Sequence, residues 1–311
     1  MKNIPVDLVI LWVNGNDPAF VLKRNEWASR LGMHVSAARF VQTDELKYVL
    51  RSAEKFLPWI TRIVLVTNGQ KLPDWLETNH YRLKILTHKE FMLADCLPTF
   101  NSCAIETGCV LWRGLAEHFL MANDDTFIFR PLPYSYFFKR GRAVNYFVEY
   151  PRKNYLLSSY GRQLLNIQKL LKGVFAAGDF PLEPYHNIMA YKKTACVAAW
   201  KKFFAVLADT RASRFRLESN ANMFIFAGVA AALGKAVWQK SRRQRWLPSD
   251  GLVWELWQNY EDEIKKYRPK LVCLNDSDLC TDGDRRKLSA FLEKIFPSAC
   301  SFEKTTRGAK R

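Results

Sequence analysis

VDLVILWVNGNDP, residues 6–18, indicates the fold class, because an apolar run leads directly into turn-forming residues. The run 6–12 is rich in β-branched side chains and almost unbroken by polar ones, which is typical of a buried strand. The turn that follows carries Asn14, Gly15 and Asp17. It is consistent with an ordinary strand-to-helix turn, or with a ligand site in which Gly15 lets a ligand approach the backbone.

Helical and extended patterns alternate on both sides of this stretch. Apolar residues recur at helical spacing from Asp44 to Trp59, and short β-branched runs lie near 63–66 and 83–86. A further helix is expected at 105–118, followed by extended segments at 119–122 and 126–129. This alternation predicts an α/β fold with a mostly parallel sheet. In such sheets ligands bind beyond the carboxyl ends of the strands.

The second half of the chain has a different residue pattern. Basic and aromatic residues interleave over 139–180, and we interpret this stretch as an inserted lobe with a helix near 164–174. We expect 1–311 to form a single catalytic domain around this lobe. Further helices are expected at 192–207, 221–233, 252–267 and 285–295, with a last strand near 271–277.

The charge balance favours an anionic partner. Lys and Arg number 47 and Asp and Glu 30, a formal net charge of +17. Nucleic acid, phospholipid headgroups and phosphorylated substrates would all fit, as would a merely solubilising surface. The basic residues are dispersed and form no RNP, zinc-finger or helix-turn-helix pattern, so a nucleic-acid-binding module is the weaker hypothesis.

Cysteine usage and hydropathy bear on location. The 7 cysteines form no CxxC pair, which argues against a disulfide framework or a structural zinc site. We find no signal-peptide pattern and no apolar run long enough to cross a bilayer. We therefore expect a cytoplasmic protein, with peripheral association at the inner face of the plasma membrane as an open alternative.

Signatures of several large enzyme classes are missing. No GxxxxGK[ST], GxGxxG, HExxH or GxSxG pattern occurs in a strand and helix context that would support it. P-loop kinases, Rossmann dehydrogenases, zincins and α/β-hydrolases are therefore disfavoured.

Asn123, Asp124 and Asp125 form the most distinctive polar motif, directly after an apolar stretch. Two adjacent carboxylates at a strand end can bind a divalent cation, which would neutralise a diphosphate. The same triplet is also typical of an Asx turn. The motif alone leaves both interpretations open.

His186 and Arg216 are weaker candidates. A histidine can serve as a general base or bind phosphate, and a guanidinium group matches phosphate oxygens bidentately. A capping histidine and a solvated charged face are the simpler interpretations of the same residues.

Four ordered stretches resemble the Stealth family of bacterial capsular polysaccharide phosphotransferases, which includes the catalytic core of the animal N-acetylglucosamine-1-phosphotransferase. The first is DLVILWVNGNDP at 7–18. The second begins at Arg39 and passes through VTNGQ, LPTFNS and AIE to the NDD motif. The third joins 185–203 with 214–226, and the fourth runs from VCLNDS at 272–277 to 301–303.

The resemblance implies a Rossmann-like nucleotide-sugar transferase core. It implies transfer of a hexose-1-phosphate from a UDP-sugar to a hydroxyl of a capsular or exopolysaccharide chain, with release of UMP. An ordinary glycosyltransferase that releases UDP is the alternative. The residues it implies are catalytic Asp125, His186 and Arg216, a metal site for Mg²⁺ at Asp124 and Asp125, and a donor pocket that includes Asp7, Asn14, Asp17, Asn275 and Asp276.

The proton acceptor is left between Asp125 and His186. A carboxylate bound to a metal is a poor base, and Asp125 next to Arg216 would have a low pKa. Both arguments favour His186 as the base and Asp125 as a metal or orienting ligand.

Overall fold

A five-stranded sheet forms the centre of the protein in a computed structural model, which describes residues 4–148, 152–175, 180, 183–240, 243–244, 247–248 and 251–305. Its strand order is β3-β2-β1-β4-β9. The first four strands are parallel, and β9 pairs antiparallel with β4. The bounds are Val6–Leu11 for β1, Arg62–Thr67 for β2, Leu83–Thr87 for β3, His118–Asn123 for β4 and Met189–Lys192 for β9.

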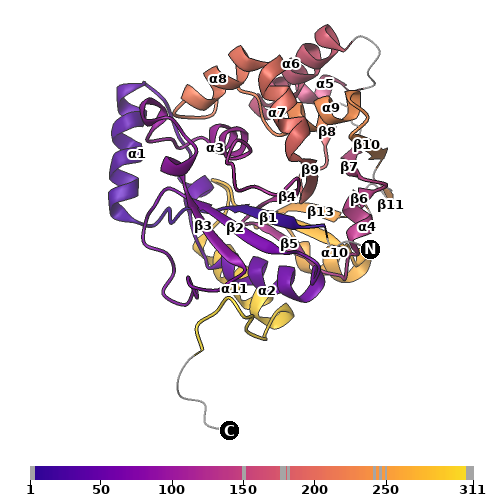
Figure 1. The fold of residues 1–311 in the computed structure, drawn as a ribbon. Coiled ribbons are helices and arrows are strands. Elements are labelled where there is room, and N and C mark those ends of the chain that lie inside the picture. The colour runs from indigo at the N-terminus through magenta and orange to yellow at the C-terminus, as the bar shows by residue number, and fades with distance from the viewer. Residues whose placement is uncertain are drawn as a thin grey trace.

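The sheet is covered on both faces (Figure 1). Successive side chains of a strand point to opposite faces. Leu8 and Ile10 therefore pack with helices α2 and α11, whereas Val9 and Leu11 pack with a second group of helices. The first layer contains α2 (Glu45–Phe56), α10 (Tyr260–Tyr267) and α11 (Asp282–Ile295), and the second contains α3 (Ser102–Cys109), α6 (Ser159–Val174), α7 (Lys193–Lys202), α8 (Phe204–Ala212) and α9 (Phe224–Ala232).

Smaller sheets extend this core. Strand β14 (Leu271–Asn275) lies between β13 (Gly251–Glu255) and β5 (Thr126–Ile128), so the end of the chain reaches the segment that follows β4. A second sheet joins β7 (Arg142–Val148) to β10 (Ala236–Lys240), β6 (Phe138–Lys139) and β8 (Glu183–Pro184), and β11 (Arg243–Gln244) pairs with β12 (Leu247–Pro248). The remaining helices are α1 (Pro18–Arg30), α4 (Tyr134–Phe137) and α5 (Arg152–Tyr155), with 3₁₀ turns at Ala38–Phe40, His88–Glu90 and Ala94–Cys96.

The predicted α/β fold with a mostly parallel sheet is confirmed, and most elements lie where the periodicity indicated. The helix expected at 192–207 is two helices, α7 and α8, which meet at Phe203. Two other helices were predicted too long. The helix expected at 105–118 ends at Cys109, and the one expected at 252–267 is a strand followed by a shorter helix. Gly251 to Glu255 is an apolar run paired with β14, and a short apolar run does not by itself distinguish a strand from a buried helix.

The stretch expected to form an inserted lobe, 139–180, is continuous with the rest of the molecule where it is described. β7 pairs with β10 over five residues, and α6 contributes Leu164, Ile167 and Leu171 to the core shared with β1 and β4. Residues 149–151 and 176–179 of this stretch lie outside the described residues. Its status as an insertion stays a prediction.

Candidate active site

The carboxyl ends of β1 and β2 are tied together by Gln70. Its amide group donates to the backbone oxygen of Asn14 at 3.0 Å and to the Asp17 carboxylate at 3.0 Å, and it accepts from the Asn14 N–H at 3.2 Å. Asp17 also accepts from the Ala19 N–H as the cap of α1. The structure therefore brings Asn14 and Asp17 together at the expected edge, with Asp17 held as a helix cap.

Gly15 in this turn makes room for protein backbone rather than for a ligand. A Cβ built on Gly15 would lie 1.5 Å from the Phe40 carbonyl oxygen. The glycine thus lets the segment before α2 cross the end of β1. That crossing carries Gln42 over the sheet, where it accepts from the Trp12 indole N–H at 3.0 Å.

Asp124 and Asp125 form the turn between β4 and β5. Asp124 accepts from the Gln42 side-chain amide at 2.8 Å, which anchors one carboxylate to the crossing segment. Asp125 interacts with the Cys273 thiol of β14, and its backbone oxygen accepts from the Leu274 N–H at 3.0 Å. The other oxygen of Asp125, Oδ1, is buried and has no hydrogen-bond partner among the described residues.

Further carboxylates surround this turn. Burial and the neighbouring carboxylates of Asp125 and Glu45 raise the pKa of Asp124 to about 8. Burial and Glu45 raise the pKa of Asp125 to about 7, with Glu255 adding to the effect. The pKa of Glu45 itself is raised by burial. We call Glu45, Asp124, Asp125 and Glu255 the carboxylate cluster.

This arrangement corrects one prediction. We expected Asp125 to have a low pKa beside Arg216, but burial raises its pKa, and the neighbouring carboxylates Glu45 and Glu255 raise it further. The argument from pKa that favoured His186 as the base therefore does not hold for this site.

Asn275 and Asp276 reach the cluster at the end of β14. Asp276 is held by Arg285 of α11 through two contacts, at 2.7 and 3.0 Å, and it contributes to the raised pKa of Glu45. Asn275 accepts from the Cys273 thiol at 3.5 Å. The last part of the chain therefore approaches Asp125 as expected, with Asp276 engaged in an ion pair.

His186 and Arg216 lie together on the other face of the sheet, in a cavity of about 110 Å³. Burial and the nearby Arg216 charge lower the pKa of His186 to about 4, so the imidazole is neutral at pH 7. Arg216 donates to the Ser102 hydroxyl at the start of α3. Glu106, one turn along α3, lines the same cavity, and burial raises its pKa to about 7 against the opposing effect of Arg216. We call His186, Arg216 and Glu106 the arginine group.

The two groups meet at the β4–β5 turn. Asn123 and Thr126, which flank the two aspartates, both line the small cavity that contains His186. Asp124 on the same turn is held by Gln42, which lines a second and larger cavity. The turn therefore separates two cavities on opposite faces of the sheet.

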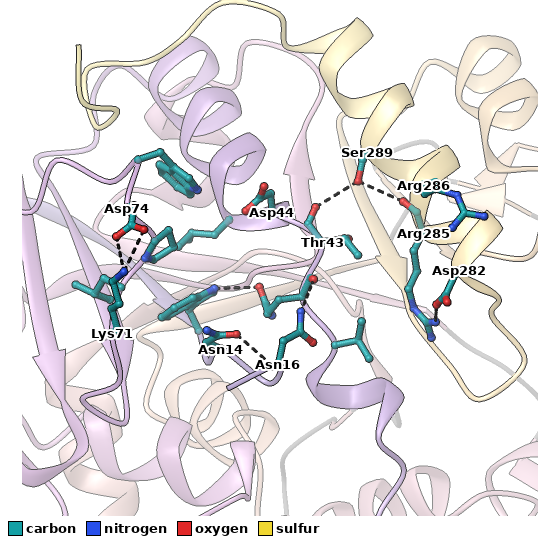
Figure 2. A pocket seen from close by; sticks show the side chains of 17 residues that line it. Asn14, Asn16, Thr43, Asp44, Lys71, Asp74, Asp282, Arg285, Arg286 and Ser289 are labelled. Atoms are coloured by element: carbon teal, nitrogen blue, oxygen red, sulfur yellow. Dashed lines mark hydrogen bonds and ion pairs between the residues drawn. The ribbon is translucent and has the colours of Figure 1, made fainter. Parts of the chain in front are cut away.

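The larger cavity has a volume of about 830 Å³ and is lined by aromatic and charged side chains (Figure 2). Arg285 and Arg286 of α11 lie on one side and Lys71 lies on the other. Trp12 and Trp75 add aromatic surface, and the Trp75 indole N–H is buried without a hydrogen-bond partner among the described residues. Asp44, at the start of α2, also lines the cavity and holds a left-handed backbone with φ 63°.

Asp7 is not brought to this edge. It lies near the beginning of β1, where its buried carboxylate pairs with Arg62 at 2.7 Å and accepts from the Ala116 N–H at 2.8 Å. Because the strand runs from Asp7 toward Asn14, the two residues lie at opposite ends of β1. The structure therefore does not bring Asp7 to Asn14 and Asp17, and its contacts with Arg62 and Ala116 are those of a structural residue.

The carboxylate cluster fits a cation that shares its coordination with a substrate. Within the described part of the chain, no group of three or more His, Cys, Asp and Glu side chains is arranged to hold a metal by itself. Mg²⁺ commonly takes only one or two carboxylates and completes its shell with phosphate oxygens and water. The unpartnered Asp125 Oδ1 and the mutual repulsion of the carboxylates are the features that a bound cation would relieve.

Several residues of the site escaped sequence reasoning. Gln42 and Glu45 lie within the second resembling stretch, and Glu106 lies in its AIE triplet, yet none of them stands out by residue type or spacing. Glu45 was recognisable as a helix-start residue, and a carboxylate in that position usually serves the helix dipole. Only the fold shows its second environment, in which the charge of Glu45 helps to raise the pKa of Asp124.

Comparison with known proteins gives consistent matches along the chain. Residues 5–32, 39–156 and 262–311 match conserved regions 1, 2 and 4 of the Stealth proteins. The capsular polysaccharide phosphotransferase fcs1 of Haemophilus influenzae is 31% identical over 72% of this chain and 64% of its own length. The capsular polysaccharide phosphotransferase WcwK of Streptococcus pneumoniae is 26% identical over 96% of this chain and 99% of its own length.

Other matches are more partial. An exopolysaccharide phosphotransferase of Streptomyces coelicolor is 44% identical over 47% of this chain, and this chain spans 25% of its length. Among solved structures, the galactosyltransferase LgtC in complex with donor and acceptor sugar analogs superposes with a TM-score of 0.44 and 8% identity, over 95% of this chain and 98% of that one.

Proposed function

Because the chain belongs to the Stealth family, we propose that it transfers a hexose-1-phosphate from a UDP-sugar to a hydroxyl of a capsular or exopolysaccharide chain, releasing UMP. The product is a phosphodiester that joins two sugars. The names of the curated relatives, capsular and exopolysaccharide phosphotransferases, support a reaction of this class.

The observation that carries the proposal is the position of the β4–β5 turn between two unlike cavities. A phosphoryl transfer needs compensation of phosphate charge, in-line positioning of the attacking oxygen and a proton acceptor. Arg216 supplies a guanidinium fork for phosphoryl oxygens on one side of the turn. Carboxylates for a proton or a cation lie on the other side.

The larger cavity suits the nucleoside diphosphate part of the donor. Its 830 Å³ falls within the range of small-molecule and cofactor pockets. Trp12 and Trp75 offer aromatic faces for a base, and the unpartnered Trp75 N–H offers a donor. Lys71 and Arg286 provide positive charge near the rim (Figure 2).

In this assignment the acceptor hydroxyl oxygen attacks the sugar-proximal phosphorus of the donor. A new phosphorus–oxygen bond forms while the bond from that phosphorus to the bridging oxygen breaks. UMP leaves with that oxygen, and the hydroxyl proton passes to the protein. Arg216 holds two phosphoryl oxygens during the transfer, and Asp124 and Asp125 would act on the diphosphate only through a bound cation, because bare carboxylates repel it.

A divalent cation such as Mg²⁺ would be held by Asp124 and Asp125, and when bound it would neutralise diphosphate charge. A thermal-shift titration tests this assignment apart from activity. Mg²⁺ should raise the melting temperature of the wild-type protein at pH 8 in the presence of UDP, and it should leave Asp124→Asn unchanged. An equal shift in Asp124→Asn would exclude these ligands.

The proton acceptor can be identified from the pH dependence of kcat. If Asp125 accepts the proton, kcat falls as pH drops below about 7, because its raised pKa means that it becomes protonated there. If His186 accepts it, kcat stays level down to about pH 4 to 5. We propose Asp125 as the acceptor when no cation occupies it and His186 when one does, so Mg²⁺ should move the acidic limb to lower pH.

The experiment that tests the function identifies the nucleotide product. Purified protein is incubated with a UDP-sugar and a capsular oligosaccharide acceptor, and the nucleotides are separated by chromatography. UMP is expected, in an amount equal to the acceptor consumed. Release of UDP would instead identify an ordinary glycosyltransferase, in which the anomeric carbon is attacked.

A further inference from the structure

The loop between α5 and α6 displays two leucines on the surface. Leu157 is 82% exposed and Leu156 is 57% exposed, whereas Tyr155 just before them is buried. The loop is firmly held. Arg162 donates to the Leu156 backbone oxygen at 2.8 Å, and Ser158 caps α6 by accepting from the Gly161 N–H at 2.9 Å. The leucines are therefore presented outward by an ordered turn, at an energetic cost that a partner surface would offset.

Lysines accompany these leucines along α6. Lys153 is exposed beside the loop, and Lys169 and Lys172 lie one turn apart on the exposed face of the helix. The stretch 152–175 contains no Asp or Glu. Among the described residues, the acidic Glu218 is bonded to this helix, and Arg162 pairs with it through contacts at 2.6 and 2.9 Å.

The other end of α6 repeats the combination of apolar and basic side chains. The Phe175 and Phe203 rings lie 6.4 Å apart, which places the end of α6 beside the junction of α7 and α8. At that junction Phe204 is 65% exposed, and Lys201 and Lys202 are exposed. α6 and α8 lie on the outer side of the helical layer, across the sheet from α2 and α11 (Figure 1).

We propose that this surface docks onto an anionic lipid bilayer, with α6 lying along the headgroups. We call it the α6 surface. The helix spans about 24 Å at 1.5 Å per residue, so its two apolar ends are separate anchors with lysines between and beside them. The α6 surface combines exposed apolar and basic side chains, namely Lys153, Leu156, Leu157, Lys169, Lys172, Val174, Lys201, Lys202 and Phe204.

The composition favours lipid over an anionic polysaccharide. Lysines would attract either partner. The exposed leucines of the loop tip gain free energy in the acyl boundary of a bilayer, but they offer a sugar phosphodiester neither a hydrogen bond nor an aromatic face, and Phe204 alone adds an aromatic ring to the surface. Among the described residues no helix is long and apolar enough to cross a membrane.

Vesicle co-sedimentation of the full chain tests the proposal. The probes are vesicles of phosphatidylcholine alone and of phosphatidylcholine mixed with phosphatidylglycerol. The first variant is Lys169→Gln/Lys172→Gln/Lys201→Gln. Its matched control is Lys55→Gln/Lys265→Gln/Lys294→Gln, which removes the same charge from exposed lysines of α2, α10 and α11. The second variant is Leu156→Ser/Leu157→Ser.

The wild type should bind the mixed vesicles in preference to neutral ones. The first variant should lower the vesicle partition coefficient on the order of 100-fold, and the second about tenfold. The control should bind as the wild type does. All variants should melt as the wild type does and release UMP from soluble substrates at its rate, which separates this proposal from the catalytic one.

Three outcomes would overturn the proposal. Equal binding to neutral and mixed vesicles would show that docking does not depend on anionic lipid. An equal loss of vesicle binding in the control variant would show that the net charge of the protein, and not the α6 surface, determines binding. Unchanged vesicle binding in both α6 variants, with weaker binding of the first variant to a phosphodiester polysaccharide, would assign the surface to the acceptor.

Discussion

The carboxylate cluster and the arginine group lie on either side of one turn, and their electrostatics are opposite. In the cluster, burial and like charges raise the pKa of Asp124 to about 8 and that of Asp125 to about 7. In the arginine group, burial and Arg216 lower the pKa of His186 to about 4. The first group favours added positive charge, and the second already contains it.

This difference suggests that the two groups interact with a diphosphate substrate in different ways. The arginine group is arranged for anionic oxygens in the protein as it stands. The carboxylate cluster needs a bound proton or cation, because its buried carboxylates repel one another. Replacing a charged side chain by a neutral one should therefore have different effects on activity and stability on the two sides of the turn.

The largest effect is expected from Asp125→Asn. Turnover should fall roughly 10³-fold, because the variant loses an acceptor or ligand at the reacting phosphate but keeps the shape of the turn. UMP release measures it, and Asp262→Asn on the exposed face of α10 is the control. Turnover within a few-fold of the wild type would remove Asp125 from the chemistry.

Asp7→Asn should act on stability instead. The buried carboxylate pairs with Arg62, so its loss should lower the free energy of unfolding by about 2–3 kcal/mol, since Arg62 is partly solvated. Urea unfolding gives this value, and kcat of the folded fraction should be unchanged. A normal stability combined with a raised KM for the donor would restore Asp7 to the donor pocket.

Arg216→Lys tests the other side of the turn. The lysine keeps the charge but loses the fork, so turnover should fall about 10²-fold. The pKa of His186, followed by NMR, should stay low in this variant and rise in Arg216→Gln, because only the latter removes the neighbouring charge. An unmoved His186 pKa in Arg216→Gln would mean that burial alone sets it.

The smallest effect concerns the pH dependence of stability. The pKa of Asp124 is higher in the folded protein than the unfolded value of about 4, so the folded state binds more protons between those two values. The free energy of unfolding should therefore decline as pH rises from 5 to 8. Asp124→Asn should be more stable than the wild type by about 2 kcal/mol at pH 8, with little difference at pH 5. An equal difference in stability between the variant and the wild type at both pH values would contradict the raised pKa of Asp124.

The sequence predicted the sheet and the edge at which the site forms, because buried strands have a strong local pattern. Residues 6–12 and 119–122 are apolar runs ended by turn residues, and Asn14 and Asp124 follow from that alone. Residues 252–255 are predicted as part of a helix, because their pairing with β14 as a strand is not a local property.

The environments of the site residues were less accessible. Asp125 and Arg216 were expected as neighbours, whereas the structure surrounds Asp125 with Glu45 and Glu255, more than a hundred residues apart from each other in the chain. The position of Asp7 away from Asn14 could not be read from the resemblance, because the resembling stretch spans the whole of β1 and so includes residues from both ends of that strand. Such errors concern tertiary contacts, which no local pattern records.

The most direct test of the central claim follows the phosphorus that the site is proposed to transfer. A UDP-sugar labelled with ³²P in its sugar-proximal phosphate is incubated with the protein and an unlabelled acceptor, and the polymer is separated from the nucleotides. The proposed reaction places the label in the polymer, in a linkage resistant to phosphomonoesterase, and Asp125→Asn abolishes the transfer. Label recovered in UDP, with unlabelled sugar in the polymer, would contradict sugar-phosphate transfer.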